Sequence, residues 1–104
     1  MIDPLLQELR ERFRETARVR LEEMRALVAR LTLDRSDLGA LERLATHFHG
    51  LTGMGGTYGF PRVSDLGAEA ERSISPLMKR GRTPDEKTIE RWDELIGEMA
   101  SELD

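Results

Sequence analysis

Residues 38–60 read LGALERLATHFHGLTGMGGTYGF, and this stretch indicates the fold of the whole chain. Its apolar residues recur every three or four positions, which places them on one stripe of a helix. They are Leu38, Leu41, Leu44, Ala45, Phe48, Leu51 and, at the far end, Gly55. Residues 47–60 also hold both histidines and more than half of the nine glycines. Glycine inside a helix costs roughly 1 kcal/mol relative to alanine, so this cluster calls for an explanation.

The two histidines lie on opposite margins of the apolar stripe. When each residue advances 100° around the helix, His47 and His49 fall about 100° to either side of the centre of the stripe. We therefore expect both to be partly exposed. Gly53 lies one turn beyond His49, and Gly56 returns to the same direction two turns on. His49 should thus look out over a strip without side chains.

The residues before this stretch also form an amphipathic helical pattern. Asp3-Pro4 is a typical helix start, and the apolar positions then continue without Gly or Pro. They are Leu6, Leu9, Phe13, Ala17, Leu21, Met24, Val28 and Leu31. The pattern permits one helix over 4–31 or two helices hinged within 16–18. We predict a short helix followed by a longer one, because a single helix of that length would extend beyond its partners in so small a domain.

Turn signals divide the remaining chain into helices. Residues 33–37 form the first turn, and 58–61 form the second, with a flexible Gly and a Pro suited to open the next helix. Pro76 should kink or trim the end of that helix. After a turn at Gly81, residues 83–86 resemble a capping box with Thr83 at the cap. The last helix should run nearly to the C-terminus.

These patterns together predict an all-α protein. We expect an antiparallel four-helix bundle with an additional short N-terminal helix, formed by a single domain over residues 1–104. The apolar stripes can all be used inside one bundle, so a monomer is the simplest expectation.

Composition excludes several classes of function. The chain has 104 residues, 38% of them hydrophobic and 35% charged, with a net charge of −4 and no cysteine. No basic block is available for a nucleic-acid backbone. No segment approaches the ~20 apolar residues of a membrane span, and the N-terminus lacks the pattern of a signal peptide. We therefore expect neither nucleic acid nor membrane as a partner, and a cytoplasmic location.

Nucleotide and metal chemistry fit the sequence poorly. Residues 50–57 come within one residue of the phosphate-binding P-loop pattern, but Gly56 stands where that loop needs lysine, and no strand precedes it. Metal-binding bundles use Glu three residues before His, whereas Leu44 and Thr46 occupy these positions. Without a cysteine or a serine in a strained turn, nucleophilic hydrolysis is also disfavoured. We expect no cofactor and no metal.

A structural explanation of the glycines competes with a functional one. Gly50, Gly53 and Gly56 are spaced so that a neighbouring helix could approach closely, and both histidines would then be ordinary surface residues. Helical periodicity alone does not decide between packing and function.

From His49 onward the sequence resembles the histidine-containing phosphotransfer (HPt) domains of two-component phosphorelay signalling. That family has a histidine, a leucine, a glycine, further small residues, an apolar residue and an acidic or amide residue at fixed spacing. The matching positions here are His49, Leu51, Gly53, Gly56, Gly59, Leu66 and Glu71. The length and helical pattern agree over essentially the whole chain.

The resemblance implies that His49 is the phosphoacceptor of a carrier without catalytic activity of its own. A neutral imidazole already has an attacking lone pair at pH 7. Its partners would be a response-regulator receiver domain, which brings Mg²⁺ and a lysine, and an upstream sensor histidine kinase. Gly53 and Gly56 would leave an open approach for the partner. Glu71 would orient the ring of His49 and leave Nε2 as the reactive nitrogen.

Three residues refine this interpretation. Thr52 occupies the position that is usually lysine in the family, so the charge that would neutralise a phosphoryl group is missing. We hypothesise that a nearby arginine such as Arg72 compensates. His47 has no counterpart in the family and is interpreted as a bystander.

The alternative function is a phosphorylation-independent helical adaptor that docks a receiver domain or kinase.

Overall fold

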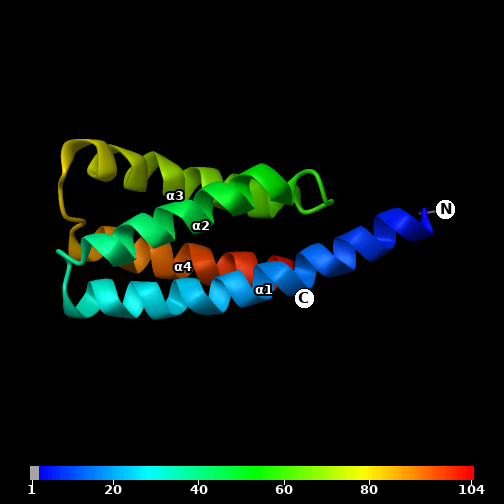
Figure 1. Ribbon diagram of the computed structural model, residues 1–104, viewed down its shortest axis with the longest axis horizontal. Helices are drawn as coiled ribbons and strands as arrows, with labels where there is room; N and C mark the ends of the chain where they lie inside the picture. Colours follow the sequence, from blue (N-terminus) through cyan, green and yellow to red (C-terminus); the bar gives the residue numbers. More distant parts are fainter. Residues whose placement is uncertain (1–2) are drawn as a thin grey trace.

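The computed structural model describes residues 3–104, which form four helices and no strand. They are α1 (Pro4–Leu33), α2 (Leu38–Gly55), α3 (Pro61–Arg80) and α4 (Glu86–Glu102). Successive helices run antiparallel and are joined by short turns (Figure 1). α2 packs against α1 and α3, and α4 closes the bundle by contacting the same two helices. The predicted all-α antiparallel bundle is confirmed.

α1 is one unbroken helix, so the prediction of a separate short N-terminal helix hinged within 16–18 was wrong. Its 30 residues, at 1.5 Å each, give about 45 Å of helix, close to the 48 Å long dimension of the molecule. Neither Gly nor Pro interrupts its hydrogen bonds after Pro4. The helix does extend beyond its partners, and its first turns project past the end of α4 (Figure 1).

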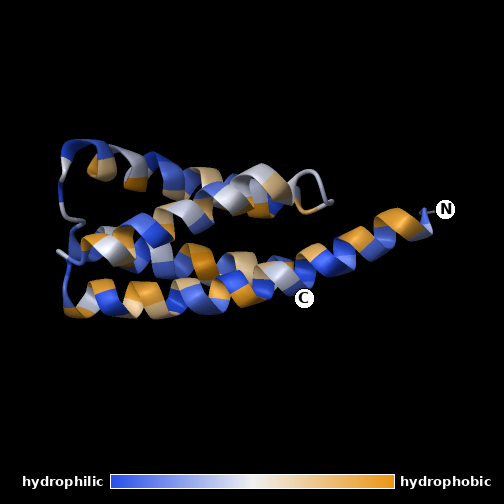
Figure 2. Cartoon of the chain, viewed as in Figure 1, coloured by the Kyte–Doolittle hydropathy of each residue, from blue (hydrophilic) through white to orange (hydrophobic). Residues whose placement is uncertain are grey.

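The projecting turns change the expected core. Leu6 and Leu9, which the apolar pattern assigned to the buried stripe, are 45% and 37% exposed, and Leu5 is 62% exposed. Figure 2 shows these apolar turns at the free end of α1, away from the packed helices. Burial on α1 begins at Phe13.

The core is a single cluster to which all four helices contribute. Phe48 of α2 and Trp92 of α4 are fully buried, with ring centroids 6.5 Å apart. Phe13 packs on Tyr58 and Phe60 and closes the core at the α2–α3 turn. No polar or charged side chain among residues 3–104 is buried. The polar chemistry of the described chain therefore lies at its surface.

Two local predictions need correction. The cap of α4 is Asp85, not Thr83, because the Asp85 carboxylate accepts the backbone N–H of Thr88 at 2.8 Å. A carboxylate also interacts favourably with the positive end of the helix dipole. Of the two effects predicted for Pro76, the trimming does not occur, because α3 continues to a left-handed C-cap at Gly81 (φ 62°), whereas the kink stays a prediction.

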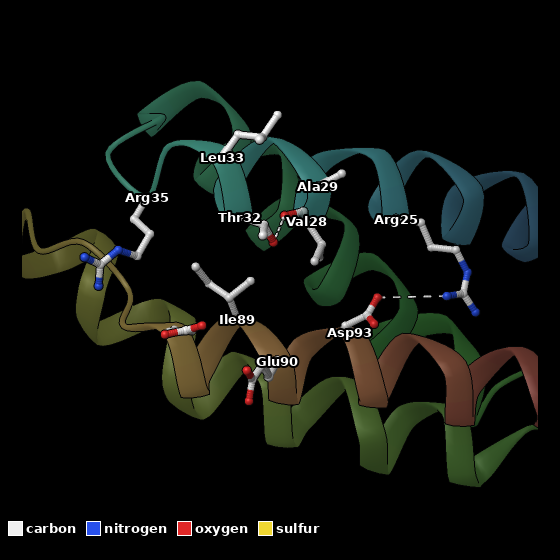
Figure 3. Close-up of a pocket in the computed structure, with 10 residues that line it drawn as sticks. Arg25, Val28, Ala29, Thr32, Leu33, Arg35, Ile89, Glu90 and Asp93 are labelled. Carbon is white, nitrogen blue, oxygen red and sulfur yellow. Dashed lines mark hydrogen bonds and ion pairs between the residues drawn. The ribbon is translucent and has the colours of Figure 1, made fainter.

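An open groove of about 790 Å³ lies between α1 and α4 (Figure 3). Val28 and Ile89 contribute apolar surface to it, and Arg25 approaches Asp93 across it at 3.9 Å. The groove contains none of the site residues predicted from the sequence.

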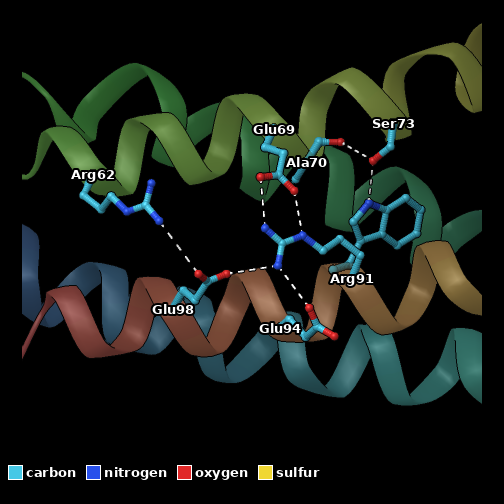
Figure 4. A network of polar contacts seen from close by, with 8 residues as sticks. Arg62, Glu69, Ala70, Ser73, Arg91, Glu94 and Glu98 are labelled. Carbon is cyan, nitrogen blue, oxygen red and sulfur yellow. Dashed lines mark hydrogen bonds and ion pairs between the residues drawn. The ribbon is translucent and has the colours of Figure 1, made fainter.

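A polar network joins α3 to α4 on the surface (Figure 4). Arg91 makes two hydrogen bonds to Glu69, at 2.7 and 3.0 Å, and also contacts Glu94 and Glu98. These bonds from Arg91 hold the pKa of Glu69 below its usual range. This network links α3 to α4, and α3 also packs against α2.

Candidate functional site

His49 stands on the exposed side of α2, with its side chain 82% exposed. Its Nδ1 lies 2.9 Å from Oε2 of Glu71 on α3, whose side chain is 25% exposed. An ionised carboxylate can only accept hydrogen bonds, so Nδ1 carries the proton of this bond. The ring's lone pair is then on Nε2, which makes no hydrogen bond to residues 3–104. The arrangement presents a nucleophilic nitrogen to solvent.

Gly53 leaves open space one turn from His49. A Cβ added at Gly53 would have no atom within 4 Å, and one at Gly56 would meet only the Ser64 hydroxyl, at an ordinary 3.6 Å. The structural explanation therefore fails at these two positions, since no helix packs closely against them. At Gly50 an added Cβ would lie 2.6 Å from the guanidinium of Arg20, which is the far end of a flexible side chain and can move away, so close packing of helices does not explain this glycine either.

Thr52 is turned into the interface between α2 and α3. It is half-buried, and its hydroxyl donates to the carbonyl of Phe48 at 2.8 Å. Its carbonyl accepts the hydroxyl of Ser64 at 2.6 Å, and that hydroxyl also accepts the backbone N–H of Gly56 at 2.9 Å. The position where a lysine would supply charge is thus occupied by a neutral side chain whose hydroxyl is already bonded.

Gly67 is a residue of this region that the sequence interpretation missed. It is buried on α3, directly against Thr52 and the carbonyl of Phe48. An isolated glycine inside a helical pattern indicates close packing, and Gly67 is such a glycine. The sequence does not show what Gly67 packs against, because this depends on the register of α2 and α3.

His47 faces α1 and is far less exposed than His49. Its side chain is 15% exposed; Nε2 lies 3.1 Å from a carboxylate oxygen of Glu23, and Nδ1 lies 3.4 Å from the guanidinium of Arg20. A neutral ring satisfies both contacts by donating from Nε2 and accepting at Nδ1. Burial lowers the pKa of His47, and the charges of Arg20 and Arg43 lower it further. His47 therefore packs α1 against α2 as a neutral ring.

Arg72 lies on the side of α3 that faces α4. It is exposed and borders a shallow hollow together with Asp85, Thr88 and Arg91. None of the ion pairs or hydrogen bonds of residues 3–104 joins Arg72 to His49 or Glu71. No contact in the described residues therefore supports the compensating role suggested for Arg72.

In the described part of the chain, no three His, Cys, Asp or Glu side chains gather into a group that could hold a metal ion. None of the helices within residues 3–104 combines the length and apolar character needed to cross a membrane.

Comparison with known proteins gives one match. A family model described as the Hpt domain matches residues 8–102, which include all four helices except the first turn of α1. No curated protein and no solved structure matches the chain significantly.

Proposed function

The chain belongs to the Hpt domain family, and from this membership we propose that His49 accepts a phosphoryl group from, and returns it to, the aspartate of a response-regulator receiver domain. The family itself implies a phosphotransfer-type role in signalling. One observation carries the assignment to His49: the ring is 82% exposed and its Nδ1 is held by Glu71, so Nε2 faces outward with its lone pair.

The transfer needs no general base. Nε2 of neutral His49 attacks the phosphorus of the receiver's aspartyl phosphate, and the bond between phosphorus and the carboxylate oxygen breaks. The electron pair of that bond leaves with the aspartate, and a bond between nitrogen and phosphorus forms. The ring keeps its Nδ1 proton and becomes positively charged. Glu71, 2.9 Å from Nδ1, stabilises this charge.

The remaining requirements fall to the partner. Phosphoryl transfer depends on in-line placement and neutralisation of the phosphoryl oxygens, and Thr52 brings no charge to the site. A receiver domain would supply Mg²⁺ and a lysine. Open space at Gly53 and Gly56 lets its aspartyl phosphate approach the ring. The chain would thus act as a carrier and not as an enzyme, supplied by a sensor histidine kinase in a cytoplasmic phosphorelay and working as a monomer.

A second candidate is a phosphorylation-independent adaptor that docks the same partners. The observation that favours it is the bonded, neutral Thr52 in place of a phosphate-neutralising lysine.

The two functions are separated by a labelling experiment. The chain is mixed with receiver domains of the same organism that carry labelled aspartyl phosphate, and with sensor kinases plus ATP. We expect acid-labile, base-stable label on the wild type and on a His47→Ala control, and none on His49→Ala. Binding to a receiver without any such label would instead support the adaptor.

A further inference from the structure

Beside His49, α2 and α3 lie close together at Gly67. A Cβ added there would overlap Oγ1 of Thr52 and would lie 3.1 Å from the Thr52 nitrogen and 3.2 Å from the Phe48 carbonyl oxygen. The last two atoms belong to the backbone of α2, so no side-chain rotation moves them away. A side chain at Gly67 would therefore require the two helices to separate by a few tenths of an ångström, in addition to moving Oγ1 of Thr52.

The atoms that Gly67 meets are themselves held in place. The Thr52 hydroxyl donates to the Phe48 carbonyl at 2.8 Å, which fixes its direction. The Thr52 carbonyl accepts the Ser64 hydroxyl at 2.6 Å, which ties this part of α2 to the first turn of α3. An added methyl at Gly67 would therefore push the helices apart instead of finding room between them.

Gly67 and its contacts flank the candidate site. Phe48 and Thr52 come immediately before and three residues after His49 on α2, while Glu71 follows Gly67 by one turn of α3. Residues four apart on a helix lie on the same face. A change in spacing at Gly67 is thus transmitted directly to the distance between His49 and Glu71.

The bond between His49 and Glu71 is too exposed to set this spacing itself. The imidazole is 82% exposed, and a single hydrogen bond in water contributes little net stability. The buried contact at Gly67 is the stronger constraint, because packed interiors resist even small changes of volume.

We propose that Gly67 is a positioning residue for His49: by lacking a side chain it lets α3 lie close enough to α2 for Glu71 to hold Nδ1, so that Nε2 keeps the lone pair. The effect on phosphotransfer rests on the proposed function, whereas the effect on the ring does not.

The test is Gly67→Ala in the full chain, read by nitrogen NMR of the His49 ring. We expect wild type to show a proton on Nδ1 and a lone pair on Nε2, and Gly67→Ala to show a mixture of the two ring tautomers. Its rate of phosphorylation should fall about 10-fold, by analogy with the lower end of the range for losing a partner that orients a metal-ligating histidine. Gly97→Ala is the matched control, since an added Cβ there is 3.9 Å from its nearest neighbour, and it should leave both readouts unchanged.

A second substitution separates positioning from general damage. Thr52→Ala removes Oγ1, the first atom that the new methyl meets, so the double variant Gly67→Ala/Thr52→Ala should recover part of the wild-type tautomer. Thr52→Ser keeps Oγ1 and should give no recovery. If Gly67→Ala does not fold, the double variant is compared with Thr52→Ala alone, and the remaining backbone contacts predict a smaller shift in the same direction.

The proposal is overturned if folded Gly67→Ala has the same His49 tautomer as the wild type. Where Gly67→Ala does not fold, it is overturned if the double variant has the same tautomer as Thr52→Ala. A shifted tautomer in a chain whose wild type takes up no phosphoryl group would uphold the positioning role and reject the proposed function. If the wild type is phosphorylated and Gly67→Ala keeps both the wild-type tautomer and the wild-type rate, the proposed function is upheld and the positioning role is rejected.

Discussion

Nδ1 of His49 on α2 lies 2.9 Å from Oε2 of Glu71 on α3, and this contact joins two residues that are 22 positions apart in the chain. It turns an exposed histidine into an oriented one, because the proton on Nδ1 leaves the lone pair on Nε2. In the proposed transfer, the same carboxylate faces the charge that develops on the ring.

Replacing Glu71 should therefore slow phosphorylation without unfolding the chain. We expect Glu71→Ala to reduce the rate of label uptake about 10-fold, by analogy with the loss of a partner that orients a metal-ligating histidine. Glu71→Gln should fall between Glu71→Ala and the wild type, because its amide oxygen still accepts the Nδ1 hydrogen but no longer offsets the positive ring. Rates of label transfer from a receiver domain measure this order. Equal rates in all three proteins would show that Glu71 has no orienting role.

A large side chain at Gly53 should block the partner and leave the fold intact. The space around Gly53 is open, and a misplacement of about 1 Å at a reacting centre can cost about 100-fold in rate. We expect Gly53→Gln to lose about that much phosphotransfer. The melting temperature should not fall, because glutamine is a better helix former than glycine. Gly39→Gln, on the first turn of the same helix, is the matched control and should transfer normally. Normal transfer by Gly53→Gln would remove the role given to the open space.

His47 should influence the pH dependence of stability and not phosphotransfer. Its pKa is lowered in the folded chain by burial, Arg20 and Arg43, so the unfolded chain takes up a proton at higher pH than the folded one. Below about pH 6.5, the usual pKa of histidine, stability is lost as the pH falls through the lower folded value. Urea unfolding between pH 7.5 and 5 should thus show a smaller loss for His47→Gln than for wild type. Parallel losses in the two proteins would contradict the neutral, packed ring.

Trp92 should carry a large share of the stability. It is fully buried, and its indole nitrogen donates to the Ser73 hydroxyl at 2.8 Å. Trp92→Ala should lower the free energy of unfolding by about 3–5 kcal/mol, the usual range for removing a large buried aromatic side chain. Leu33→Ala is the control: Leu33 is 90% exposed, and such changes stay within about 0.5 kcal/mol. Circular dichroism during urea unfolding gives both values, and similar values for the two variants would contradict the packing described here.

The helical fold could be predicted because its signals are local. Apolar spacing, Gly59, Pro61 and Gly81 mark the helices and two of the turns, and the chain turns where they predict. The predicted hinge within 16–18 was wrong because it depended on an assumed overall shape, whereas the uninterrupted local pattern favoured one helix. The cap of α4 was misplaced because Thr83 and Asp85 are both good capping residues, and only the observed hydrogen bond distinguishes them.

The site could be predicted only in part for a related reason. The exposed direction of His49 and the space at Gly53 follow from the geometry of one helix. The pairing with Glu71 came from the family resemblance, since it depends on how two helices are aligned. The contact of Gly67 with Thr52 and the contact of His47 with α1 depend on the same kind of alignment, and neither was predicted.

In the proposed function, Nε2 of His49 carries the phosphoryl group. The most direct test is phosphorus and nitrogen NMR of the ¹⁵N-labelled chain after phosphorylation by a receiver domain, which identifies both the residue and the ring nitrogen bonded to phosphorus. We predict one phosphohistidine, at Nε2 of His49, and no change at the ring of His47. Phosphorus on Nδ1 of His49, or on any other residue, would contradict the assignment to Nε2 of His49.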